Sequence, residues 1–248
     1  MLGFIGTGEL TAAIVTGLDG RVPAVVSPRS RAIGAELAAR FPAVTVAGSN
    51  QEVLDRADVV VLAVRPPVLR ELAAELAFRP EQVIVSAVAG VPLGQLRELV
   101  APAARVVRSI PLPQAAQRQS LTVLYPEDAA ARELFELVGR VLVPRDEPGL
   151  EVFSASTATF AAHLDYLATI AGWMAAQGVD AEAASAYVRH VFAEVGKSLS
   201  GGGSLDELTT RHMTPGGINE QLMTDLRRDG VPNLVRAALD AVLARLRG

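Results

Sequence analysis

The opening of the chain constrains its fold most, because a short strand, a glycine turn and a helix follow one another directly. Residues 2–5 are apolar, Gly6-Thr7-Gly8 comes next, and apolar residues then recur at helical spacing up to Gly17. Such a turn lets backbone N–H groups and the positive end of the helix approach an anion. We therefore predict that the pyrophosphate of a dinucleotide binds at Gly6, Thr7, Gly8, Glu9 and Leu10. An ordinary turn between strand and helix is the alternative, since Thr11 replaces the third glycine of the dinucleotide fingerprint.

Strand-like and helix-like segments alternate over residues 1–147. Further strands are expected at residues 22–27, 43–47, 59–64, 83–87, 105–110 and 121–125, with a last edge strand at 142–144. Helices are expected at residues 32–41, 50–56, 68–76, 93–99 and 127–138. The pattern predicts an α/β domain, a Rossmann-type doubly wound parallel sheet. Ligands bind at the carboxyl ends of such strands, so the predicted cofactor site also includes Val64, Arg65, Pro66, Ala89 and Pro111.

The end of the second strand bears on the choice of cofactor. It reads Ser27-Pro28-Arg29-Ser30-Arg31, without the carboxylate that would accept hydrogen bonds from an NAD ribose. Guanidinium groups bind phosphate through paired N–H donors, so Ser27, Arg29 and Arg31 favour the 2′-phosphate of NADP over NAD. The alternative is a solvated turn with Ser30 as the helix cap.

Residues 148–248 read as a smaller all-α domain. The segment 150–177 is predicted to be one long helix, rich in alanine, serine and glycine, which allow helices to approach closely. We expect it to build a homodimer, or a higher homo-oligomer, by interlocking helices. Ser204 and Glu207 predict a capping box, and a turn at residues 213–217 precedes a helix expected at 218–228.

Composition excludes several classes of function. The 248 residues include no cysteine, which removes disulfides and thiolate metal sites, and three scattered histidines predict no metal site. The net charge of −4 without a basic stripe argues against nucleic acid. No targeting or membrane-spanning segment is indicated, so a cytoplasmic location without membrane attachment is expected. Lys197 is the only lysine, which leaves little room for Schiff-base chemistry.

Several stretches together resemble the pyrroline-5-carboxylate reductase family. They are residues 3–8, Ala63-Val64-Arg65-Pro66, residues 86–90, Arg108-Ser109-Ile110-Pro111, and above all the turn Met213-Thr214-Pro215-Gly216-Gly217. The resemblance covers essentially the whole chain. It implies NAD(P)H-dependent reduction of a cyclic imine such as pyrroline-5-carboxylate to proline, with substrate bound at Pro215, Gly216, Gly217 and Asn219. Backbone N–H groups of the two glycines would receive its carboxylate, whereas the alternative is a turn that merely joins helices.

The chain departs from the family pattern at four places. Arg65 replaces a lysine, Leu112 lies where the family has asparagine, and Ile218-Asn219 replaces a threonine pair whose second member bonds to substrate. Residues 155–159 replace Gly-Ser-Gly-Pro-Ala. These changes leave the fold intact but bear on the substrate, which is a small imino acid or imine.

Candidate catalytic residues are Asn219, Thr214, His163 and Tyr166. His163 and Tyr166 are three residues apart on the predicted long helix, where either is a candidate proton donor. The alternative for this pair is an interface histidine and a core tyrosine. His212 is a similar case, and His190 is expected to be structural.

Two other functions remain open. One is reduction of another imine or carbonyl substrate, as in an imine reductase or a β-hydroxyacid dehydrogenase, although Lys197 does not lie where the latter family keeps its catalytic lysine. The other is a sensor that binds NADPH without catalysis.

Overall fold

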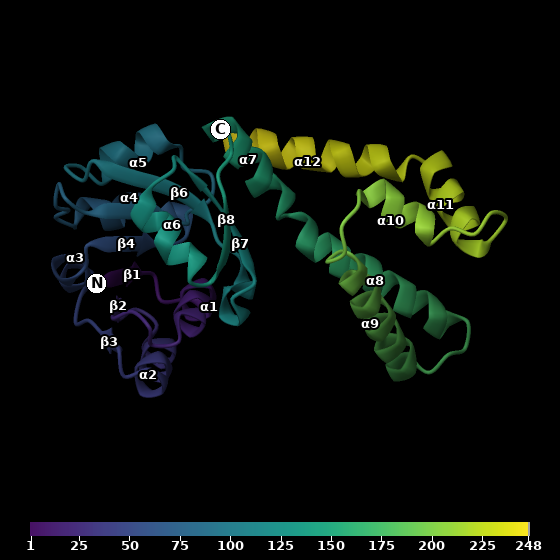
Figure 1. Ribbon diagram of the computed structural model, residues 1–248, viewed down its shortest axis with the longest axis horizontal. Coiled ribbons are helices and arrows are strands. Elements are labelled where there is room, and N and C mark those ends of the chain that lie inside the picture. The colour runs from purple at the N-terminus through teal and green to yellow at the C-terminus, as the bar shows by residue number, and fades with distance from the viewer. Residues whose placement is uncertain (248) are drawn as a thin grey trace. The chain divides into compact units, whose positions relative to one another are not determined.

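The computed structural model describes residues 1–247, which form two compact units. The first contains Met1–Ala155 and the residues from Leu243 onward, and the second contains Ser156–Val242. The chain thus changes unit after Ala155, whereas the sequence pattern placed the change after residue 147, and the end of the chain returns to the first unit (Figure 1).

The first unit is built on one sheet with the strand order β3-β2-β1-β4-β5-β6-β7-β8. The strands are β1 (Leu2–Ile5), β2 (Ala24–Val26), β3 (Val44–Val46), β4 (Val59–Leu62), β5 (Val83–Ser86), β6 (Arg105–Ile110), β7 (Ser120–Tyr125) and β8 (Gly139–Leu142). All neighbouring pairs are parallel except β6 and β7. The predicted doubly wound sheet is therefore confirmed, but β7 and β8 run against the other strands.

The helices of this unit are α1 (Glu9–Leu18), α2 (Arg31–Arg40), α3 (Asn50–Arg56), α4 (Pro66–Ala74), α5 (Leu93–Leu99), α6 (Ala129–Glu136) and α7 (Glu147–Ser156), with a 3-10 turn η1 (Pro113–Gln117). Helix α4 begins earlier than predicted, because Pro66 and Pro67 have the backbone angle of a first helical turn. Strand β8 also begins earlier, at Gly139, whose φ of +152° suits glycine and whose β-carbon would lie 2.0 Å from the carbonyl oxygen of Ser120.

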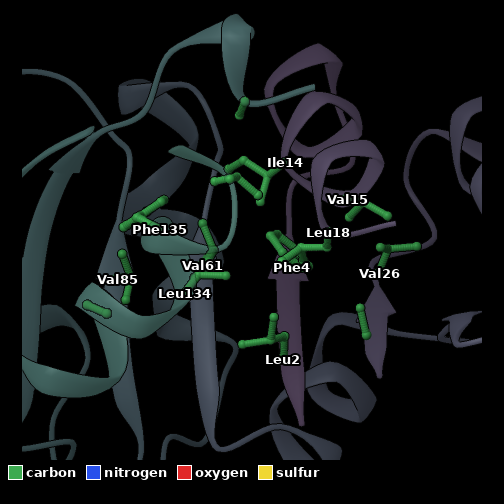
Figure 2. Packing of buried hydrophobic residues seen from close by; sticks show 14 of the residues in the cluster. Leu2, Phe4, Ile14, Val15, Leu18, Val26, Val61, Val85, Leu134 and Phe135 are labelled. Carbon is green, nitrogen blue, oxygen red and sulfur yellow. The ribbon is translucent and has the colours of Figure 1, made fainter. Parts of the chain in front are cut away.

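Two apolar layers cover the sheet. Side chains of α1, α2 and α6 pack on one face with Phe4, Val61 and Val85, as Figure 2 shows for α1 and α6. Side chains of α3, α4 and α5 pack on the other face with Ile5 and Val60. Because successive strand residues point to opposite faces, strands buried on both sides are continuously apolar, as the run from Val59 indicated.

The second unit consists of helices only. They are α8 (Thr159–Ala176), α9 (Ala181–Ser198), α10 (Leu205–Arg211), α11 (Ile218–Arg228) and α12 (Val231–Arg247), of which α12 ends in the first unit. The predicted single helix over residues 150–177 is wrong, since it divides between α7 and α8. The capping box of Ser204 and Glu207 and the helix at 218–228 are confirmed.

Much apolar surface of this unit is exposed. Helices α8, α11 and α12 have no buried residue, and Leu164, Trp173, Ile218 and Leu234 each have more than half of their surface exposed. No helix of residues 1–247 is long and apolar enough to cross a membrane.

Candidate functional site

The glycine turn after β1 forms an open cradle. Gly6 has a φ of +101°, and a β-carbon there would lie 2.3 Å from the carbonyl oxygen of Ala63 at the end of β4, so this position requires glycine. Gly8 is the N-cap of α1, no side chain caps the helix, and a β-carbon on Gly8 would meet nothing within 4 Å. A helix start with no side-chain cap and open space beside its N-cap residue suits the pyrophosphate of a dinucleotide.

Buried hydroxyl groups hold this turn in place. The Gly6 N–H donates to Ser27 Oγ at 3.0 Å, and Thr7 Oγ1 donates to the Ser27 carbonyl at 2.6 Å. Thr11 is fully buried, and its hydroxyl donates to the Gly6 carbonyl at 2.6 Å. The threonine at the third glycine position therefore stabilises the turn through a hydrogen bond to the Gly6 carbonyl. Thr7 and Ser27 are both buried, so their side chains shape the cradle, and the Ser27 hydroxyl faces this turn rather than the 2′-phosphate to which the sequence assigned it.

The two arginines after β2 are exposed. Neither Arg29 nor Arg31 forms an ion pair within residues 1–247, and Ser30, the N-cap of α2, makes no capping hydrogen bond with its side chain. Two available guanidinium groups and an uncapped helix start therefore lie at the end of β2, next to the strand that leads into the glycine turn. This arrangement can bind a phosphate.

The other predicted cofactor residues lie at the ends of β4, β5 and β6. Val64 adjoins the turn, since a β-carbon on Gly6 would lie 3.0 Å from its Cγ1. Arg65 is the exposed N-cap of α4, followed by Pro66. Ala89 is exposed after β5, whereas Pro111 is buried, so its side chain does not face solvent.

The segment after Pro111 is fixed against α1. A β-carbon on Gly17 would lie 2.0 Å from the Ala115 carbonyl oxygen, so glycine permits the close approach of η1. Arg118 Nε donates to the Gly17 carbonyl at 2.8 Å, and the same guanidinium pairs with Asp19. A hollow of about 470 Å³ lies between α1 and η1, lined by Glu9, Leu10, Ala12, Ala13, Thr16, Pro113 and Ala116. The structure thus joins the predicted pyrophosphate turn to the segment after β6.

The turn before α11 differs from its prediction in one respect. The N–H groups of Gly216 and Gly217 were expected to receive a substrate carboxylate, but both have partners. Gly216 N–H donates to Glu220 Oε2 at 2.6 Å, and Gly217 N–H donates to the Thr214 carbonyl at 2.8 Å. Glu220 was missed by the sequence reasoning, although a glutamate three residues after an N-cap is the spacing at which such a side chain reaches back to the backbone.

Neighbouring residues complete this turn. Asn219 Nδ2 donates to the His212 carbonyl at 2.9 Å, and Thr214 and Pro215 are exposed. A hollow of about 240 Å³ is lined by Gly216, Gly217, Glu220, Gln221, Thr224 and Asp225. A β-carbon on Gly217 would lie 2.9 Å from the Thr214 carbonyl oxygen, so a larger residue there disturbs the turn itself.

His163 and Tyr166 both lie exposed on α8. Tyr166 is 44% exposed, and its ring meets that of Phe192 on α9 edge to face at a centroid distance of 6.4 Å. It is therefore not a core residue of the chain. The long helix predicted to carry this pair is in fact two helices, and Ser156 ends α7 before α8 begins at Thr159. Residues 1–247 contain no group of three or more His, Asp or Glu residues arranged to hold a metal ion.

An open glycine cradle on a doubly wound sheet, with available arginines at the next strand, defines a nucleotide-binding oxidoreductase fold. Residues 1–90 match the model of the family described as NADP oxidoreductase coenzyme F420-dependent, and residues 149–248 match that of pyrroline-5-carboxylate reductase dimerisation. The chain is 31% identical to a pyrroline-5-carboxylate reductase of Pseudomonas aeruginosa, with 98% of this chain and 94% of that protein covered. It belongs to the pyrroline-5-carboxylate reductase family, whose members are oxidoreductases acting on a C=N bond.

Solved structures show the same fold. The chain is similar to a 1-pyrroline-5-carboxylate reductase of Streptococcus pyogenes with a TM-score of 0.83 and 24% identity, covering 99% of this chain and 97% of that one. A pyrroline carboxylate reductase of Plasmodium falciparum, solved with NADP bound, has a TM-score of 0.79 and 16% identity, with 99% and 96% covered.

Proposed function

We propose that this protein reduces pyrroline-5-carboxylate to proline with NADPH. The observation that carries the proposal is the open cradle at Gly8 in a chain that resembles pyrroline-5-carboxylate reductases along its whole length. The bound nicotinamide supplies a hydride to the carbon of the C=N bond. The chain itself has to hold the dinucleotide, fix the substrate and keep water away.

The cofactor contacts follow from the charges of the first unit. The N–H groups at the start of α1 hold the pyrophosphate, and Arg29 and Arg31 hold the 2′-phosphate of NADPH. Both arginines are exposed and without an ion pair in the described part of the chain, so they meet the phosphate without first breaking another pair. A site for NADH would instead need a carboxylate for the ribose hydroxyl, which this turn lacks.

The turn at residues 214–220 is our proposed substrate site. An imino acid carries a carboxylate, and Glu220 already presents a carboxylate to the Gly216 N–H. We propose that the substrate carboxylate replaces that of Glu220 at this donor, while Asn219 stands in for the hydrogen-bonding threonine of the family. Thr214 and Pro215 border the turn and contribute contacts.

The proton requirement of the reaction is small. A protonated imine is already cationic, and it accepts the hydride without a further proton, so no general acid is obligatory. His163 and Tyr166 lie one helical turn apart on α8, and both are exposed. We propose that either can donate a proton to a substrate that arrives as the neutral imine.

The helical unit is proposed to form a homodimer. Its exposed large apolar side chains include Leu164 and Trp173, which are 65% and 64% exposed in the single chain. Large apolar side chains that are exposed in the single chain are what a partner subunit would cover, and the match to the dimerisation model covers the same residues.

Turnover of pyrroline-5-carboxylate with NADPH, followed by loss of absorbance of the reduced cofactor, tests the proposal. NADH under the same conditions tests cofactor choice. Tight NADPH binding without turnover of any cyclic imine would contradict the proposed activity and indicate a sensor that binds NADPH without catalysis.

One observation favours a second substrate class. Because the Gly216 and Gly217 N–H groups both have partners, a cyclic imine without a carboxylate would not need to displace Glu220. Comparison of pyrroline-5-carboxylate with unsubstituted 1-pyrroline separates the two, and a higher kcat/KM for 1-pyrroline would assign the second class.

A further inference from the structure

A buried arginine lies outside the site described above. The Arg108 side chain on β6 is only 4% exposed and pairs with Glu147 at 2.5 Å and with Glu151 at 3.4 Å. Both glutamates are on α7, one helical turn apart. A buried charge is tolerated only when oppositely charged groups lie close to it. The ion pairs with Arg108 therefore hold α7 against β6.

Each glutamate has a second partner. Glu147 Oε1 also accepts from the Leu93 N–H at 2.6 Å, at the start of α5. Glu151 Oε2 accepts from Arg247 Nε at 3.0 Å, in the last turn of α12. The cluster therefore contains two cations and two carboxylates, and it joins the start of α5 to the last turn of α12.

The last turn of α12 also contacts the loop between β5 and α5, residues 87–92. Gly90 has a φ of +71°, and its β-carbon would lie 3.6 Å from Leu246 Cδ2, an ordinary van der Waals distance. Leu246 thus lies against the loop at Gly90, and Glu147 holds Leu93, the residue that follows the loop. Both contacts lie within the first unit.

The loop lies where a ligand is expected. It follows the carboxyl end of β5, between β4 and β6, and ligands of doubly wound sheets bind at that edge. Ala89 and Gly90 are exposed there, so their backbone is available to a ligand. The pyrophosphate cradle at Gly8 is a separate segment, and it holds the charged part of the cofactor.

We infer that Leu246 and Arg247 are positioning residues for the nicotinamide half of the cofactor, acting through the loop of residues 87–92. The inference rests on the proposed function, because it takes NADPH as the ligand at this edge. Arg247 holds the last turn of α12 through Glu151, and Leu246 then fixes the loop. Loss of this contact leaves the phosphates bound but lets the reacting ring move.

Arg247→Ala is the test, since the Arg247 side chain is 47% exposed and its removal leaves the buried Arg108 with both carboxylates. We expect kcat to fall at least about fivefold, because small displacements of a reacting group slow hydride transfer steeply. The NADPH Kd, measured by fluorescence, should stay within about threefold, because the phosphates dominate it. Backbone hydrogen exchange in residues 87–92 should accelerate. Arg247→Lys, which keeps the charge, should restore much of kcat.

Arg245→Ala is the matched control, two residues away on α12, exposed and without an ion pair within residues 1–247. A lower Tm for Arg247→Ala, with loop exchange and kcat equal to those of Arg245→Ala, would reduce the contact to a structural clamp and overturn the inference. Absence of wild-type turnover would refute the proposed function instead. The exchange and NADPH-binding measurements need no turnover, so they decide the positioning role separately.

Discussion

Gly8→Val separates cofactor binding from folding. The backbone of Gly8 has a φ of −108° and a ψ of −169°, which valine adopts readily, and a β-carbon there meets no atom within 4 Å. The added methyl groups would project into the space that we assign to the pyrophosphate. The variant should therefore fold and lose the cofactor.

The two effects differ greatly in size. Valine is a poorer N-cap than glycine, which costs up to about 1 kcal/mol of folding free energy. For a chain of this length that corresponds to a fall in Tm of roughly 2–4 °C. Each hydrogen bond from a backbone N–H to a charged phosphate contributes about 1.5–3 kcal/mol, so the loss of two weakens NADPH binding by roughly 10²- to 10⁴-fold.

Fluorescence titration with NADPH and thermal unfolding of the same samples measure both quantities. Gly202→Val is the control, because that loop glycine also has nothing within 4 Å of its β-carbon position. If Gly8→Val binds NADPH within about threefold of wild type, the pyrophosphate is not held at this turn and the assignment of the cradle is wrong.

The double variant Arg29→Ala, Arg31→Ala should weaken NADPH at least about tenfold and leave NADH nearly unchanged, because only NADPH has the 2′-phosphate; equal wild-type affinities for the two cofactors would contradict this. Ala168→Leu should yield monomers or aggregates in sedimentation, since overpacking a close helix contact costs about 1–3 kcal/mol, and a wild type that is monomeric at micromolar concentration refutes the dimer. Glu220→Gln should lower KM for pyrroline-5-carboxylate roughly tenfold by removing the competing carboxylate, whereas a rise in KM would show that Glu220 holds the substrate. Asn219→Ala should lower kcat with little change in KM if its amide bonds to the transition state, and an unchanged kcat would leave it only the bond to the His212 carbonyl.

The fold of the first unit could be predicted from local patterns. A parallel strand covered on both faces must be apolar throughout, and Val59–Leu62 is such a run. The direction of β7 could not be predicted in this way, because an antiparallel strand buried on both faces has the same apolar composition as a parallel one. Only its pairing with β6, Ser109 opposite Leu124, shows it.

The helical unit shows a second limit of local patterns. Residues 150–177 have no proline and a helical composition, so the sequence predicted one helix. The division between α7 and α8 depends on what each end packs against, since Leu150 and Ala155 are buried in α7 and no residue of α8 is buried.

At the candidate site, the sequence by itself determined the glycine turn, the arginines after β2 and the turn before α11, because each depends on residues close together in the chain. Tertiary structure alone decided which of these residues are buried and which distant residues bond to them. It buried Ser27 behind Gly6, and it brought Glu147 and Glu151 to Arg108 and Arg247 to Glu151. The physical reason is that a hydrogen bond or ion pair depends on distance in space, and residues 108 and 147 become neighbours only after the sheet has formed.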